Sequence, residues 1–111
     1  MNIAIIGRSE LLYNVALVSG PKHSVRLIIT SKEAPEYKVS SRDFENLAIE
    51  LGAAFHYAPK LNATKIATQI NELAIDIAVS INYSSIISQD VIDLFPLGIL
   101  NVHGGDLPRY R

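Results

Sequence analysis

The sequence predicts an α/β fold in which helices cover both faces of a parallel sheet, the doubly wound arrangement. Short apolar runs alternate with longer amphipathic segments along the chain, which is the pattern of consecutive β-α-β units. The chain has 111 residues, of which 49% are hydrophobic and 19% charged. This size and composition are typical of one globular domain with a core of its own.

The first strand and helix follow from local signals. Residues 2–6 form a continuous apolar run that Gly7 closes, as expected of a buried central strand. A helix is predicted from Ser9, a suitable N-cap, to Ser19, before Gly20-Pro21. Its apolar residues recur at helical spacing: Leu11, Leu12, Val15, Ala16 and Leu17.

The rest of the chain repeats this alternation. Further strands are expected at 24–30, 54–57, 75–81 and 98–102, and further helices near 42–52, 62–73 and 88–94, with a polar loop at 31–41. Right-handed crossovers between parallel strands give a sheet of order 3-2-1-4-5.

Charge and composition exclude several functions. The net charge of −1 gives no electrostatic footprint for nucleic acid or anionic membrane, so neither is expected as a partner of this part. The absence of cysteine rules out disulfides and thiolate nucleophiles. No apolar run approaches the ~20 residues that span a bilayer, and a cytoplasmic location is expected. The three histidines are too dispersed to predict a metal site.

The first loop, Gly7-Arg8-Ser9-Glu10, lies where α/β folds bind phosphate at a helix N-terminus. Arg8 and Ser9 are therefore candidate substrate-binding residues, while a tight turn with a helix cap is the alternative that we favour. A dinucleotide site, and with it an NAD-dependent oxidoreductase, is disfavoured. The next glycine after Gly7 is Gly20, and no acidic residue follows the second strand.

The strongest candidate site is the pair Asn101 and His103, at and just past the end of the last predicted strand. Open α/β sheets bind ligands at such carboxyl ends, and residues two apart on an extended segment point to the same side. An amide N–H can stabilise a developing oxyanion, and imidazole can exchange a proton near neutral pH. The pair is therefore chemically suited to acyl transfer, and because no serine or cysteine nucleophile accompanies it, a covalent intermediate is not indicated.

The segment 100–111, Leu-Asn-Val-His-Gly-Gly-Asp-Leu-Pro-Arg-Tyr-Arg, resembles the signature of the formyltetrahydrofolate-dependent formyltransferases. That family includes methionyl-tRNA, glycinamide ribonucleotide and nucleotide-sugar formyltransferases. The resemblance implies transfer of a formyl group from 10-formyltetrahydrofolate to a primary amine, with Asn101 polarising the formyl oxygen and His103 stabilising or protonating the intermediate. It implies a pteridine pocket lined by Ile86, Ile87 and Ile99, and a cis bond at Leu107-Pro108.

Two departures from the family pattern bear on substrate and activity. The loop 104–108, Gly-Gly-Asp-Leu-Pro, replaces the usual Ser-Leu-Leu-Pro type and is more similar to sugar-type or unassigned members than to the tRNA enzyme. The family's third catalytic residue, an aspartate, is expected beyond residue 111. We therefore expect residues 1–111 to be the N-terminal part of a formyltransferase catalytic domain, truncated after the fifth strand and inactive alone.

Two further expectations concern partners. An uncovered fifth strand leaves backbone groups unpaired, so pairing with another copy through 97–102 is expected. The alternative function is a non-catalytic module that keeps the fold and binds a ligand or a protein.

Overall fold

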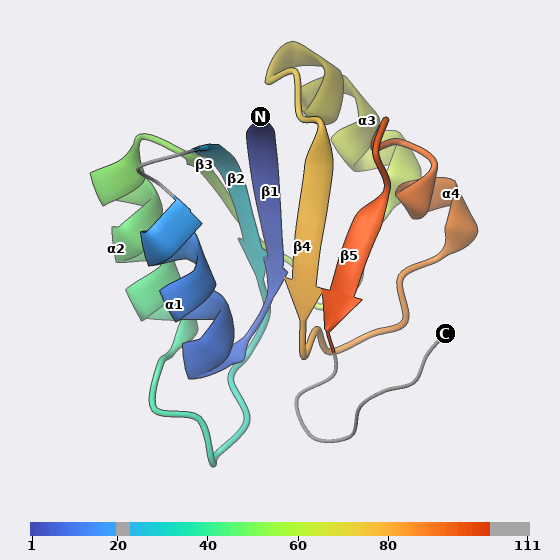
Figure 1. Cartoon of the computed structure of the whole chain (residues 1–111). Coiled ribbons are helices and arrows are strands. Elements are labelled where there is room, and N and C mark those ends of the chain that lie inside the picture. Colours follow the sequence, from blue (N-terminus) through green and yellow to red (C-terminus); the bar gives the residue numbers. More distant parts are fainter. Residues whose placement is uncertain (20–22, 103–111) are drawn as a thin grey trace.

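The computed structural model describes residues 1–19 and 23–102. They form a five-stranded, all-parallel sheet of order β3-β2-β1-β4-β5 (Figure 1). The strands are β1 (Asn2–Gly7), β2 (Ser24–Thr30), β3 (Ala54–Tyr57), β4 (Ile77–Ile81) and β5 (Ile99–Val102). The predicted fold class and strand order are confirmed.

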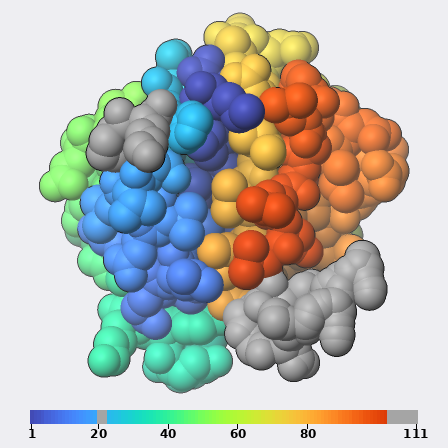
Figure 2. Space-filling model, viewed as in Figure 1, coloured from blue at the N-terminus to red at the C-terminus, as the bar shows by residue number. Residues whose placement is uncertain are grey.

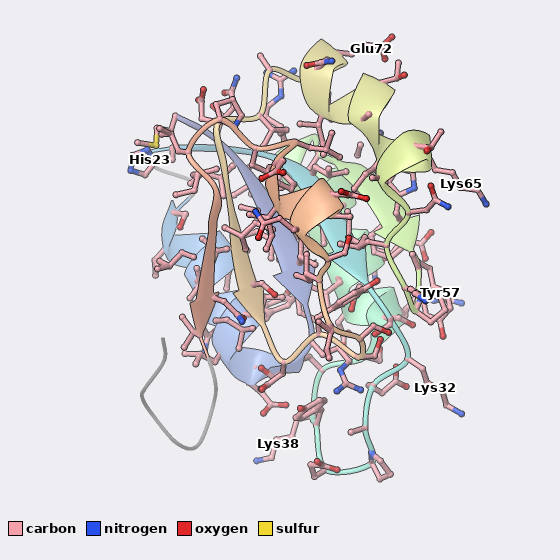
Figure 3. The ribbon with its side chains drawn as sticks, turned by 90° about the vertical axis from the view of Figure 1, so that its right-hand side faces the viewer. His23, Lys32, Lys38, Tyr57, Lys65 and Glu72 are labelled. Atoms are coloured by element: carbon pink, nitrogen blue, oxygen red, sulfur yellow. The ribbon has the colours of Figure 1, made fainter. Side chains whose placement is uncertain are left out.

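Helices cover both faces of this sheet. Helices α1 (Ser9–Ser19) and α2 (Ser41–Leu51) lie on one face, and α3 (Ala63–Glu72) and α4 (Gln89–Ile92) on the other (Figures 1 and 3). Alternate strand residues point to opposite faces, so two hydrophobic clusters form. One contains Ile5, Ile28 and Phe44, and the other contains Ile6 and Ile29. Burial of the sheet on both faces explains the nearly continuous apolar runs of the sequence.

The ends of α2 show how the sequence sets an element's length. Ser40 is the N-cap, and its side chain accepts a hydrogen bond from the Asp43 backbone N–H, while Asp43 accepts one in return from the Ser40 N–H. Gly52 ends the helix with a left-handed φ of 70°. The capping box and the C-terminal glycine satisfy backbone groups that the helix leaves free.

Helix α1 buries a narrower stripe than its sequence suggests. Leu12 and Ala16 are buried against the sheet, but Leu11 and Leu17 are 47% and 44% exposed. A helix on a sheet contacts it along one line only, so apolar residues flanking that line stay in water.

Strand β4 and helix α4 are shorter than expected. Strand β4 starts at Ile77, and the Asp76 side chain just before it accepts a hydrogen bond from the Asn2 N–H at 2.8 Å. Helix α4 ends at Ile92, and turns occupy the residues before Pro96.

The outer strand β5 has little cover on the face that α1 and α2 share. Leu100 of β5 is 58% exposed and pairs in register with Val79 of β4. In Figure 2 these strands lie open at the surface beside α1. Within the described ranges, no strand pairs with the outer side of β5.

Among the residues that the structure describes, no helix is long and apolar enough to cross a membrane.

Candidate functional site

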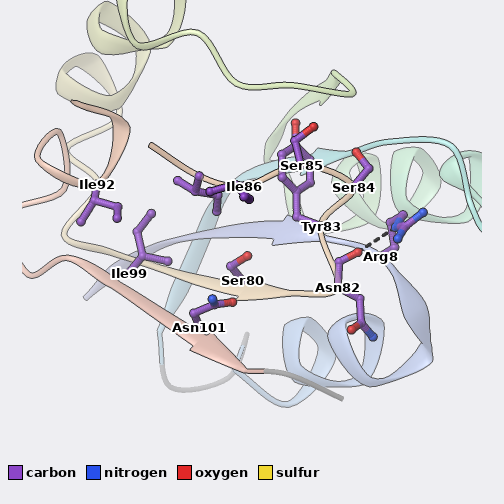
Figure 4. A pocket seen from close by; sticks show the side chains of 11 residues that line it. Arg8, Ser80, Asn82, Tyr83, Ser84, Ser85, Ile86, Ile92, Ile99 and Asn101 are labelled. Carbon is purple, nitrogen blue, oxygen red and sulfur yellow. Dashed lines mark hydrogen bonds between the residues drawn. The ribbon is translucent and has the colours of Figure 1, made fainter. Parts of the chain in front are cut away.

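A cleft opens at the carboxyl edge of the sheet, between the end of β1, the ends of β4 and β5, and the loop after β4 (Figure 4). Its volume is about 600 Å³, within the range of small-molecule sites. It is lined by Arg8, Ser80, residues 82–87, Ile92, Ile99 and Asn101. Arg8 is the only charged side chain among these lining residues.

The floor of the cleft comes from two paired strands. Ser80 of β4 lies in register with Asn101 of β5, so the two side chains are neighbours on the same face of the sheet. Ile99, two residues before Asn101, shares that face and also lines the cleft. A hydroxyl and an amide thus lie side by side, next to an apolar surface.

One wall of the cleft is apolar and exposed to solvent. Ile86 has 95% of its surface exposed, and Ile87, Ile92 and Ile99 continue the apolar lining (Figure 4). A large aliphatic side chain held in water has no role in the core. It is suited to cover the flat face of a bound ligand.

The loop after β4 is attached to the neighbouring loop after β3 by three hydroxyl groups. The Tyr83 hydroxyl donates to the Ala58 carbonyl. Those of Ser84 and Ser85 donate to the Pro59 carbonyl at 2.9 and 2.8 Å. Partial burial raises the pKa of Tyr83 to about 12, because the phenolate would lose solvation. Tyr83 therefore remains a neutral hydrogen-bond donor at physiological pH.

The loop after β1 approaches the end of β4 closely. Gly7 has φ +140°, and a Cβ atom there would lie 1.9 Å from the Ile81 carbonyl oxygen. The next residue, Arg8, lines the cleft and donates hydrogen bonds from its guanidinium to the backbone carbonyls of Asn82 and Lys32. Ser9 is buried, and its hydroxyl has no partner among the described residues.

The structure brings most of the predicted site residues together. Asn101, Ile86, Ile87, Ile99 and Arg8 all line one cleft, whereas Ser9 does not. The remaining predictions, namely His103, the cis bond at Leu107-Pro108 and the loop 104–108, lie outside the described residues.

Ser80 and Ile92 are among the lining residues that sequence reasoning missed. For Ser80 a signal was present, since it is a polar interruption of an apolar strand one residue before the strand's carboxyl end. Ile92 reaches the cleft only through the fold of the short helix α4.

The other histidines are accounted for locally. His56 of β3 is partly buried and hydrogen-bonded to Gln69, and His23 is exposed at the opposite edge of the sheet. Among residues 1–19 and 23–102, no cluster of three potential ligands could hold a metal ion.

Comparison with known proteins identifies the family. The sequence profile described as "Formyl transferase" matches residues 1–111. The chain belongs to the formyl transferase family. It is 30% identical to the methionyl-tRNA formyltransferase of Ruminiclostridium cellulolyticum, over all of this chain and 37% of the relative. It is 33% identical to that of Buchnera aphidicola, over 86% of this chain and 30% of the relative.

Two solved structures have the same fold. Glycinamide ribonucleotide transformylase 1 from Symbiobacterium toebii superposes with a TM-score of 0.66 at 16% identity, covering 97% of this chain and 53% of that protein. The protein of the same name from Geobacillus kaustophilus gives 0.63 at 16% identity, over 92% and 57%. The formyl transferase chain described here spans little more than a third of the length of the first curated relative.

Proposed function

We propose that this protein transfers a formyl group from 10-formyltetrahydrofolate to a primary amine. The observation that carries the proposal is the joint position of Asn101 and the isoleucine wall in one cleft at the carboxyl edge of the sheet. The formyl transferase family to which the chain belongs supports the same class of reaction.

The lining of the cleft fits a folate. A pteridine ring is flat, with two large faces and a polar rim. Ile86, Ile87 and Ile99 would cover a face, while the amide of Asn101 and the hydroxyl of Ser80 would meet polar groups at the rim. The donor, when bound, supplies the formyl carbon to the amine.

The residues of the chain would then act on charge and protons. The amine nitrogen forms a bond to the formyl carbon, the bond from that carbon to the folate nitrogen breaks, and the amine proton moves to the folate nitrogen. The Asn101 amide N–H would donate a hydrogen bond to the formyl oxygen as its negative charge rises. His103, two residues further along the chain, would carry the proton between the two nitrogens.

The acceptor is proposed only as a primary amine. Aminoacyl-tRNA, amino-sugar nucleotides and small amines would be tested side by side, with the release of tetrahydrofolate as the common readout. The expected cytoplasmic location and the binding of this folate remain predictions.

The first experiment measures binding of 5-formyltetrahydrofolate, a stable analogue, by calorimetry. It uses this chain and, where the chain is part of a longer natural polypeptide, that full-length protein. Saturable binding by the full-length protein supports the proposal, and no binding at millimolar concentration would contradict it.

The second experiment uses Asn101→Asp, which keeps the shape of the side chain but removes its N–H donor. We expect formyl transfer by the full-length protein to fall about 100-fold, the usual effect of losing one oxyanion donor. Formyl transfer unchanged in this variant and in His103→Ala would refute the roles proposed for Asn101 and His103, whereas folate binding without any formyl transfer would favour the non-catalytic binding module.

A further inference from the structure

We propose that Arg8 is a positioning residue that holds one wall of the cleft, and that it does not act by contacting substrate. The wall consists of residues 82–87, called the wall loop below, which carries Ile86 and Ile87. What the wall loop binds rests on the proposed function, but its attachment to Arg8 does not.

The guanidinium of Arg8 is engaged with backbone atoms of two loops. Its Nε donates to the Asn82 carbonyl at 2.7 Å, across 74 positions of sequence (Figure 4). Its Nη1 donates to the Lys32 carbonyl at 3.2 Å, and its Cζ lies 5.3 Å from the centre of the Tyr37 ring. A planar guanidinium can serve two carbonyls and an aromatic face at once, whereas a lysine ammonium offers no such fork.

Burial holds only part of the wall loop. Tyr83 and Ile87 pack against the hydrophobic cluster that contains Ile6 and Ile29. Ile86, between them, is 95% exposed, so the hydrophobic effect contributes little to its position. The loop begins at Asn82, whose φ of +54° is a left-handed conformation that asparagine adopts more readily than most residues. Polar contacts therefore add to the partial burial in holding the loop.

These contacts act from two sides. The hydroxyls of Tyr83, Ser84 and Ser85 tie the middle of the wall loop to the loop after β3. Arg8, which follows β1, holds the first residue of the wall loop, Asn82. The bond from Arg8 is the only one of these with a charged donor, and charge-assisted hydrogen bonds are roughly twice as strong as neutral ones.

The backbone of Arg8 is itself fixed. Its N–H donates to the Ile81 carbonyl at 2.9 Å, one residue before the wall loop begins. The preceding residue, Gly7, accepts a hydrogen bond from the Thr30 hydroxyl at 2.7 Å. Arg8 thus extends from the turn between β1 and α1, which is hydrogen-bonded to both β4 and β2, so little freedom is lost when its side chain holds the loop.

The test compares Arg8→Met and Arg8→Lys with a control, Arg42→Met, which removes an exposed arginine from the start of α2. The first readout is amide hydrogen exchange without ligand. We expect residues 83–87 to exchange about tenfold faster in Arg8→Met, since a charge-assisted bond is lost. Strand amides should be unchanged in all variants, and Arg8→Lys should recover part of the protection because it keeps the charge.

The second readout is the affinity for 5-formyltetrahydrofolate in the full-length protein. Weakening of about tenfold in Arg8→Met, together with faster loop exchange, supports the proposal. If the wall loop of Arg8→Met exchanges at the same rate as in the Arg42→Met control, the proposal is overturned. Weaker folate binding without faster loop exchange would also overturn it, because that result indicates direct contact between Arg8 and the ligand. Faster loop exchange in a protein that binds no folate at all would uphold the role of Arg8 and refute the proposed function.

Discussion

Replacing Gly7 by alanine should strongly lower the stability of the fold, because this glycine permits the contact between the first loop and β4. A Cβ atom at this position would lie 1.9 Å from the Ile81 carbonyl oxygen, and φ is +140°. The same carbonyl accepts the N–H of Arg8 at 2.9 Å. Alanine can therefore be accommodated only if β1 and β4 move apart where the cleft begins.

The cost has three parts. The unfavourable φ contributes about 1–3 kcal/mol, the lost hydrogen bond to Ile81 about 1 kcal/mol, and the displaced packing about 1–3 kcal/mol. Together these give about 3–7 kcal/mol. A chain of 111 residues has a free energy of unfolding of roughly 6–17 kcal/mol, so Gly7→Ala removes a large part of it.

Urea denaturation measures this effect against two matched controls. Gly52 and Gly98 also have positive φ, but nothing lies within 4 Å of a Cβ atom added at either. Gly52→Ala and Gly98→Ala should lose only the conformational term, about 1–2 kcal/mol. If the free energy of unfolding of Gly7→Ala lies within about 1 kcal/mol of the values for these two controls, the contact with Ile81 carries no such cost and the reasoning is wrong.

Three further predictions concern the wall loop and the outer strand. Ile86→Ser should change the free energy of unfolding by less than about 0.5 kcal/mol, as expected of an exposed side chain, yet weaken 5-formyltetrahydrofolate binding in calorimetry. A stability change above 1 kcal/mol would show that Ile86 is structural. Burial raises the pKa of Tyr83 to about 12, above its ordinary value near 10, so its contribution to stability is present below pH 10 and lost as the pH rises to 12. In Tyr83→Phe, the urea midpoint should therefore fall less steeply between pH 10 and pH 12. An unchanged slope would show that ionisation of Tyr83 does not cause this loss of stability. Finally, sedimentation equilibrium of this chain should show self-association through 97–102, which Leu100→Lys weakens, whereas a monomer at 100 µM and above would refute it.

Much of the fold was predictable because its signals are local. The apolar run before Gly7 and the alternation of later runs indicate a parallel sheet, and the right-handed crossover then orders the strands. Ser40 and Gly52 mark the ends of α2 through their own backbone chemistry. The bounds of α1 were predicted correctly, but spacing alone does not show whether Leu11 faces the sheet or the solvent.

The site was predictable in part for a related reason. Asn101 lies at a strand's carboxyl end, where parallel sheets bind ligands. The family resemblance implied that Ile86, Ile87 and Ile99 line the pocket. Ser80 was missed because a serine within a strand is unremarkable until its neighbour in the sheet is known to be Asn101. The predicted role of His103 lies outside the described residues and stays a prediction.

The sequence by itself determined the elements, their order and the edge of the sheet at which chemistry would lie, since each of these follows from periodicity and chain direction. Only the tertiary structure decided which loops touch. The bond from Arg8 to the Asn82 carbonyl joins residues 74 positions apart, and the 95% exposure of Ile86 depends on how its loop is held. Such contacts form between segments with no common local pattern, so they arise only when the packed sheet brings the loops together.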